Sequence, residues 1–245
     1  MKKLFVLGMA VVMLAAACAA YAYPTFTGPT GLVNAPTAEV APAGQLDLAV
    51  DYFASKNDET GDKNSWPVRV LYGAGSGFEV GAAYDVNGIA GKSLWDVNAK
   101  YKTTFCPAGI DLAIGAIYGQ ANTDPDTLRA TQAYLAGTKC FNLVLPIALT
   151  IGANWTQLEQ LDAVSGWHGF IGADVTLMKQ LDLVADYQTI NKHLDGKSLW
   201  SACLRYCVTP ALAVQAGVNN GLFVGTSKSR YFVGANYAFN LAGTK

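Results

Sequence analysis

The chain has 245 residues, of which 51% are hydrophobic and only 14% are charged, and its formal net charge is −1. Without a basic excess, the composition does not favour a nucleic-acid partner. Beyond the N-terminal residues, no stretch reaches the ~18 uninterrupted apolar positions of a membrane helix. An apolar chain whose apolar residues are scattered is typical of a transmembrane β-barrel, in which only alternate residues face lipid.

The first segment, "MKKLFVLGMAVVMLAAACAAYA", predicts a secretory signal peptide. It combines a basic start, an apolar run and an A-x-A cleavage site at Ala20–Ala22. Cleavage after Ala22 would leave 223 residues with 15 basic and 18 acidic side chains, a formal charge of about −3. A second interpretation remains open, in which Cys18 is the lipid-modified cysteine of a lipoprotein.

Residues 23–43 form a Pro/Gly-rich segment before the first strand. Its prolines and glycines argue against regular structure before Gln45. We expect Gly31–Ala43 to pack into or across the periplasmic mouth of the barrel, stiffened by Pro36 and Pro42.

Residues 44–245 are predicted to form the barrel, because apolar and polar residues alternate with a period of two in segment after segment. The stretch "WDVNAKYKTTF" illustrates this pattern, with Trp95, Val97 and Tyr101 on one face and Asp96, Lys100 and Lys102 on the other. Twelve such segments are expected, near 45–54, 66–74, 78–86, 94–105, 110–119, 130–139, 145–155, 166–177, 181–190, 198–208, 210–218 and 229–240. Most are about the length that a tilted strand needs to cross a bilayer.

The connections between these strands alternate between long and short. The long ones are "SKNDETGDKNS", "VNGIAGKS", "QANTDPDTLR", "TQLEQLDAVS", "NKHLDGKS" and "NNGLFVGTSKS", and the short ones "GAGSG", "CPAG", "FNLV", "MKQ" and "VTP". All long loops therefore fall at one end and all short turns at the other. This predicts extracellular loops and periplasmic turns, the asymmetry of outer-membrane barrels.

The tryptophans give an independent indication, because each lies next to a long loop. We predict that they are membrane-interface anchors in an aromatic girdle: Trp66, Trp95, Trp155, Trp167 and Trp200. Tryptophans that merely fill a soluble core would be scattered along strand centres.

The polar face of the strands predicts the residues that line the lumen. They are Asp47, Asp51, Arg69, Glu79, Asp85, Asp96, Lys100, Lys102, Asp111, Asp174, Asp182, Asp186, Arg205 and Arg230, nine acids and five bases. Buried charges require pairing or hydration. Two interpretations stay open: a mutually neutralised plug of ion pairs that stabilises the barrel, and a polar channel with a mild cation preference.

No catalytic, metal or cofactor site is predicted. His168 follows Ser165 closely, but the sequence holds no G-x-S-x-G motif, so an outer-membrane hydrolase is only a remote alternative. The mature cysteines Cys106, Cys140, Cys203 and Cys207 fit no zinc spacing. Cys203 and Cys207 lie four residues apart on one expected strand and cannot pair there, and the pairing is otherwise open.

The pattern T-G-L-x-x-x-P-T-A-x-x-x-P-x-G-x-L, from Thr30 to Leu46, resembles the opening of YjbH-like outer-membrane proteins. That resemblance implies an association with exopolysaccharide secretion. The sequence as a whole predicts a twelve-stranded outer-membrane barrel that contacts lipid and either passes small polar solutes or ions or serves as a structural or surface-binding barrel. It does not predict the oligomeric state.

Overall fold

The computed structural model describes residues 22–54, 64–89, 92–103, 109–122, 127–159, 164–189, 198–220 and 229–241. Residues 1–21 of the predicted signal peptide, which include Cys18, lie outside the described residues, as do Cys106 and parts of the predicted long loops. Within the described part of the chain, no helix is long and apolar enough to cross a membrane.

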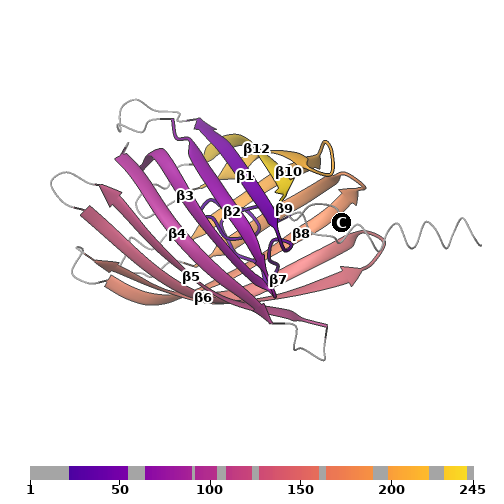
Figure 1. Ribbon diagram of the computed structural model, residues 1–245, viewed down its shortest axis with the longest axis horizontal. Helices are drawn as coiled ribbons and strands as arrows, with labels where there is room; N and C mark the ends of the chain where they lie inside the picture. Colours follow the sequence, from indigo (N-terminus) through magenta and orange to yellow (C-terminus); the bar gives the residue numbers. More distant parts are fainter. Residues whose placement is uncertain are drawn as a thin grey trace, which may run out of the picture.

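Twelve antiparallel strands close into a barrel in which each strand pairs with its neighbours in sequence and β1 pairs with β12 (Figure 1). The strands are β1 (Gln45–Ala54), β2 (Pro67–Gly75), β3 (Phe78–Ile89), β4 (Lys92–Thr103), β5 (Asp111–Asn122), β6 (Thr127–Asn142), β7 (Pro146–Glu159), β8 (Val164–Met178), β9 (Leu181–Gln188), β10 (Leu199–Cys207), β11 (Leu212–Asn219) and β12 (Arg230–Asn240). The predicted fold and strand number are confirmed. Closure leaves no unpaired sheet edge.

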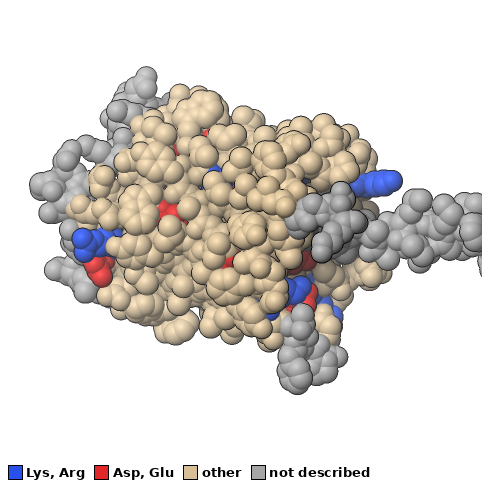
Figure 2. Space-filling model, viewed as in Figure 1, with Lys and Arg blue, Asp and Glu red and all other residues tan. Residues whose placement is uncertain are grey.

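The period-two pattern of the sequence becomes an inner and an outer wall. On β2, Arg69 and Leu71 are buried inside, whereas Val68, Val70 and Tyr72 face outward. The outer wall is almost entirely apolar, and Figure 2 shows few charged side chains on the side in view. Such a continuous apolar surface is stable against lipid and would be unusual in water.

Several strands are longer than the sequence predicted. The segment "VNGIAGKS" was expected to be a long loop, but β3 continues to Ile89 and β4 starts at Lys92. Beyond the aromatic belt, both faces of a strand meet water, so the alternation fades while the hydrogen-bond ladder continues. Arg129 and Glu159 illustrate this extension, because they are register partners with an ion-pair distance of 3.7 Å in a region expected to be loop.

The lipid-facing wall can be tested at Ile151, an exposed residue near the middle of β7. Ile151→Arg should lower the free energy of unfolding in lipid vesicles by about 2–4 kcal/mol, because it places a charge in the hydrocarbon layer. Urea unfolding followed by tryptophan fluorescence measures this. Val144→Arg, in the turn between β6 and β7, is the control and should change little. Equal effects at both positions would contradict a lipid-facing wall.

Candidate functional site

The bore of the barrel is occupied by the chain itself. Residues 22–43, called the lumen segment from here on, run inside the barrel and appear as the indigo trace between its walls (Figure 1). Most of the segment is buried, including Tyr23, Phe26, Leu32 and Ala35. Gly31–Ala43 was expected to pack into or across the mouth of the barrel, and in the structure most of this stretch is buried within the bore.

The lumen segment folds back on itself through two short turns. Isolated antiparallel bridges join Pro24 to Thr30 and Gly31 to Pro36. Gly28 has a φ of 95°, which favours glycine, and it packs against Asn98 on β4. The doubled-back backbone spreads across the bore, so the segment closes more of it than an extended chain would.

Glu79 on β3 is the first anchor of the lumen segment. Its carboxylate accepts hydrogen bonds from the Thr30 amide (2.9 Å), the Thr30 hydroxyl (2.6 Å) and the Ala41 amide (2.8 Å). Lys100, its register partner on β4, lies 2.8 Å away and donates to the carbonyl oxygen of Thr30. Both side chains are fully buried. The hydrogen bonds to the segment therefore supply partners that water cannot provide to this buried ion pair.

Asp186 on β9 is the second anchor. One of its oxygens accepts three successive backbone amides, those of Val33 (2.9 Å), Asn34 (2.7 Å) and Ala35 (3.2 Å). Its other oxygen accepts the Ser201 hydroxyl at 2.6 Å. Hydrogen bonds to a charged acceptor are stronger than neutral ones, so a single carboxylate fixes this turn of the segment.

Two arginines of the wall also bind the lumen segment, through their positively charged guanidinium groups. Arg69 pairs with Asp51 and donates to the Pro24 carbonyl at 3.2 Å. Arg205 donates to the Leu32 carbonyl at 3.1 Å, and its guanidinium lies 4.1 Å from the centre of the Tyr23 ring. Burial raises the pKa of Tyr23 to about 12 although both guanidiniums lower it, so the phenol stays neutral.

Apolar packing completes the closure at mid-height. Phe26, Leu32 and Val33 of the segment join a cluster with wall residues that include Phe53 and Phe232. The Phe26 ring meets Phe53 and Phe232 edge-on, at centroid distances of 4.7 and 5.1 Å. The bore is therefore packed like a protein core at this level.

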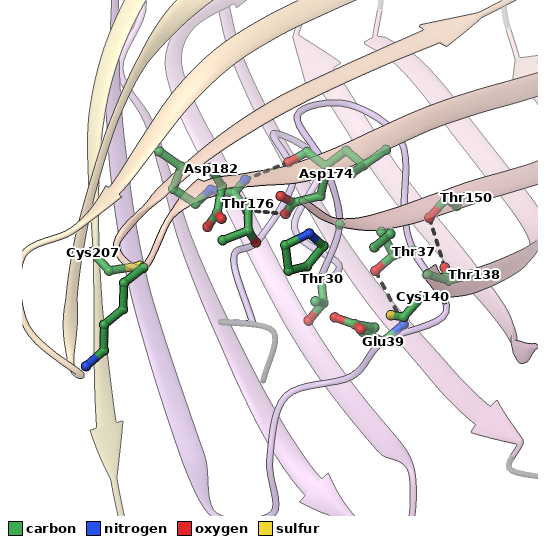
Figure 3. A pocket seen from close by; sticks show the side chains of 16 residues that line it. Thr30, Thr37, Glu39, Thr138, Cys140, Thr150, Asp174, Thr176, Asp182 and Cys207 are labelled. Atoms are coloured by element: carbon green, nitrogen blue, oxygen red, sulfur yellow. Dashed lines mark hydrogen bonds and ion pairs between the residues drawn. The ribbon is translucent and has the colours of Figure 1, made fainter. Parts of the chain in front are cut away.

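Two cavities remain, one on each side of the lumen segment. The inner cavity lies toward the short turns and is polar; Figure 3 shows Thr37 and Glu39 of the segment facing Asp174 and Asp182 of the wall. Burial raises the pKa of Glu39, against the lowering effect of Lys102 and Lys100.

The outer cavity lies toward the long loops, has a volume of about 170 Å³, and is lined by Phe26, Asn34, Asp96 and Ile117 among others. The turn Thr30–Thr37 contributes residues to both cavities and therefore forms the partition between them.

The structure places the fourteen predicted lumen residues on inward-facing positions of their strands. Ten are buried: Asp47, Asp51, Arg69, Glu79, Asp85, Asp96, Lys100, Asp186, Arg205 and Arg230. Lys102, Asp111, Asp174 and Asp182 are half-buried, near the short turns. Five of these charges contact the lumen segment: Arg69, Glu79, Lys100, Asp186 and Arg205. Ion pairs also join several of them to one another: Arg69–Asp51, Lys100–Glu79, Lys102–Asp111 and Arg205–Asp174.

The predicted anchors lie on the outer face. Trp66, Trp167 and Trp200 are exposed and Trp95 and Trp155 are half-exposed. Trp155 and Trp167 are register partners, and Trp66 packs on Tyr52 at 4.6 Å.

Ser165 and His168 do not form a catalytic pair, because Ser165 is exposed and His168 is buried inside the barrel. Cys203 and Cys207 both lie on the inner face of β10 and are not disulfide-bonded. Among the described residues, no group of three or more His, Cys, Asp or Glu side chains could hold a metal ion.

The sequence did not predict the uncharged polar residues of the wall that hydrogen-bond to the lumen segment. Thr138 accepts the Ala38 amide at 2.9 Å, and Asn219 donates to the Asn34 side chain at 3.0 Å. A signal existed in the inward Ser, Thr and Asn residues of alternating strands, but nothing in the sequence shows what they face.

Known proteins resemble this chain in structure only. No family model matches it, and no curated protein matches its sequence. The KdgM porin superposes with a TM-score of 0.57 at 14% identity, covering 80% of this chain and 99% of the porin. An outer-membrane channel from Pseudomonas putida F1 gives 0.56 at 13%, covering 82% and 97%, and the NanC porin 0.51 at 13%, covering 78% and 98%.

The closed barrel and its apolar wall define a transmembrane β-barrel with the fold of outer-membrane porins. At these identities the likeness concerns the fold. In this chain, the bore binds the lumen segment through Glu79 and Asp186.

The Glu79 anchor can be tested by Glu79→Gln, which leaves Lys100 buried without its carboxylate. The free energy of unfolding should fall by about 3–5 kcal/mol, as for other broken buried pairs. Urea unfolding in detergent micelles measures this, and residues 22–43 should become more sensitive to protease.

Glu159→Gln is the matched control, because it breaks the exposed pair with Arg129 and should cost less than about 1 kcal/mol. The double variant Glu79→Gln/Lys100→Met should recover part of the loss. Equal stability of Glu79→Gln and the unmodified protein would show that the pair does not hold the segment.

Proposed function

We propose that this protein is an outer-membrane channel for small polar solutes or ions, and that its own residues 22–43 close the bore. One observation carries the proposal: the lumen segment lies between two cavities of the bore and contributes residues to both. The segment belongs to no strand and is held by hydrogen bonds that water can replace. A closed barrel whose plug is part of the same chain can open by moving that plug.

The chemistry of the wall supports a polar path behind the segment. With the segment removed, the inward side chains would include nine acids and five bases, which favours cations mildly over anions. The fold shared with the KdgM and NanC porins supports the same class of function.

A second candidate is a structural or surface-binding barrel that does not conduct. The apolar cluster of Phe26, Leu32 and Val33 with the wall favours it, because this packing resists displacement. The resemblance of Thr30–Leu46 to YjbH-like proteins would connect such a barrel with the envelope or with exopolysaccharide export.

Deletion of residues 24–43 separates the two candidates. In a planar lipid bilayer, the deletion variant should show a larger single-channel conductance than the intact protein, with preference for cations, because the partition is gone. A synthetic peptide of residues 22–43 should reduce the conductance again. Unchanged conductance after the deletion would reject the channel closed by its segment and favour the non-conducting barrel.

The double variant Glu79→Gln/Asp186→Asn provides a second test, because it keeps every apolar residue of the core while weakening both anchors. Its conductance should show more frequent openings than that of the intact protein. Circular dichroism verifies that both variants retain the barrel. A folded double variant with no change in openings would also count against the proposal.

A further inference from the structure

Three residues that line the outer cavity each carry a buried polar atom that has no hydrogen-bond partner. These atoms are Oδ1 of Asp96, Oδ1 of Asn154 and Nδ1 of His168. The exposed fractions of these residues are 5%, 2% and 9%, and all three line the same cavity. A buried polar atom without a partner is uncommon and costs free energy, so three around one cavity point to a ligand.

Asn154 on β7 and His168 on β8, which carry two of these atoms, are register partners and therefore neighbours on the inner wall. The His168 ring also hydrogen-bonds to the backbone of Thr189. In the neutral ring one nitrogen donates that bond, which leaves the other as an acceptor. When Asp96 is ionised, all three unpartnered atoms are acceptors, and they require a ligand that donates.

Asp96 is the group whose ionised form would select a cation among donors, because a cation offsets the cost of a buried carboxylate. Other buried acids of the bore have partners: Asp51 pairs with Arg69, Glu79 pairs with Lys100, and Asp85 accepts the Ser65 hydroxyl at 2.5 Å. Among the described residues, no ion pair or hydrogen bond engages the Asp96 carboxylate. A buried carboxylate is most strongly stabilised by a cation, so a cationic donor fits better than a neutral one.

The remainder of the cavity is suited to an apolar body. Leu94, Ile117 and Leu158 contribute to its lining, and Phe26 forms part of its floor. Its volume of about 170 Å³ is similar to the ~150 Å³ of an apolar cavity that accepts benzene. The space therefore suits a single ring or a short alkyl chain that carries one charged head.

We propose that the outer cavity is a binding site for a small organic cation, with its ammonium group on Asp96 and its apolar body against Ile117 and Leu158. Asn154 and His168 accept the remaining N–H or O–H groups of the ligand. The site lies on one side of the lumen segment and is complete while the bore is closed. It therefore does not depend on conduction, and binding can be measured whether or not the protein forms a channel.

The test compares phenethylammonium with 2-phenylethanol, which has nearly the same shape but no charge. Isothermal titration of the refolded full-length protein in detergent should show the amine binding at least about tenfold more tightly. Asp96→Asn should remove that difference while circular dichroism shows an intact barrel. Asp182→Asn is the matched control, because it removes a carboxylate from the inner cavity and should leave the affinity unchanged.

A steric variant distinguishes the cavity from the protein surface. Ala130 lines the outer cavity, and Ala130→Leu should fill part of it and weaken both probes by about tenfold. Equal affinities for amine and alcohol in the unmodified protein would overturn the proposal. So would an amine affinity that is unchanged in Asp96→Asn or in Ala130→Leu.

Discussion

The structure depends on the need to satisfy charges inside a closed barrel. The carboxylates of Glu79 and Asp186 are buried, and an unpartnered buried charge would cost several kcal/mol. The lumen segment has the complementary need, because an irregular buried backbone carries amides and carbonyls without ladder partners. The amides of Thr30 and Ala41 meet Glu79, and those of Val33 to Ala35 meet Asp186. The hydrogen-bonding groups of the wall and of the segment therefore satisfy one another.

The strand register places inward-facing glycines opposite large aromatic residues, which makes space in the bore for the lumen segment. Tyr134 lies opposite Gly115 and Phe170 opposite Gly152, so each ring can lie over the neighbouring strand where a larger side chain would collide with it. Gly172 likewise allows Leu32 of the segment to approach the wall. Inward glycines thus have a steric role: they let aromatic rings fill one part of the bore while the segment fills another.

The sequence predicted the barrel well because lipid on one side and polar groups on the other impose a period of two on every strand. It predicted strand ends less well, since Asn87–Ile89 and Arg129 lie where the outer face no longer meets lipid and the alternation weakens. The sequence did not predict that inward charges bind the lumen segment. Asp186 accepts hydrogen bonds from the backbone amides of Val33, Asn34 and Ala35. Almost every residue type has a backbone amide, so the sequence does not show which residues form such bonds. The prolines and glycines of residues 23–43 indicated an irregular segment, but not how deep it lies.

The two kinds of contact that hold the segment have different consequences for opening. When the segment moves, water can replace the amides on Glu79 and Asp186, so each such bond contributes only a modest net stabilisation. Phe26, Leu32 and Val33 form no hydrogen bonds with water that would replace their packing contacts. Exposing them costs about 25 cal/mol for each Å² of apolar surface. The carboxylates therefore set where the segment docks, whereas Phe26, Leu32 and Val33 set how firmly the bore is closed. A ligand or partner that opens the barrel would have to cover that apolar surface, not merely compete for the anchoring charges.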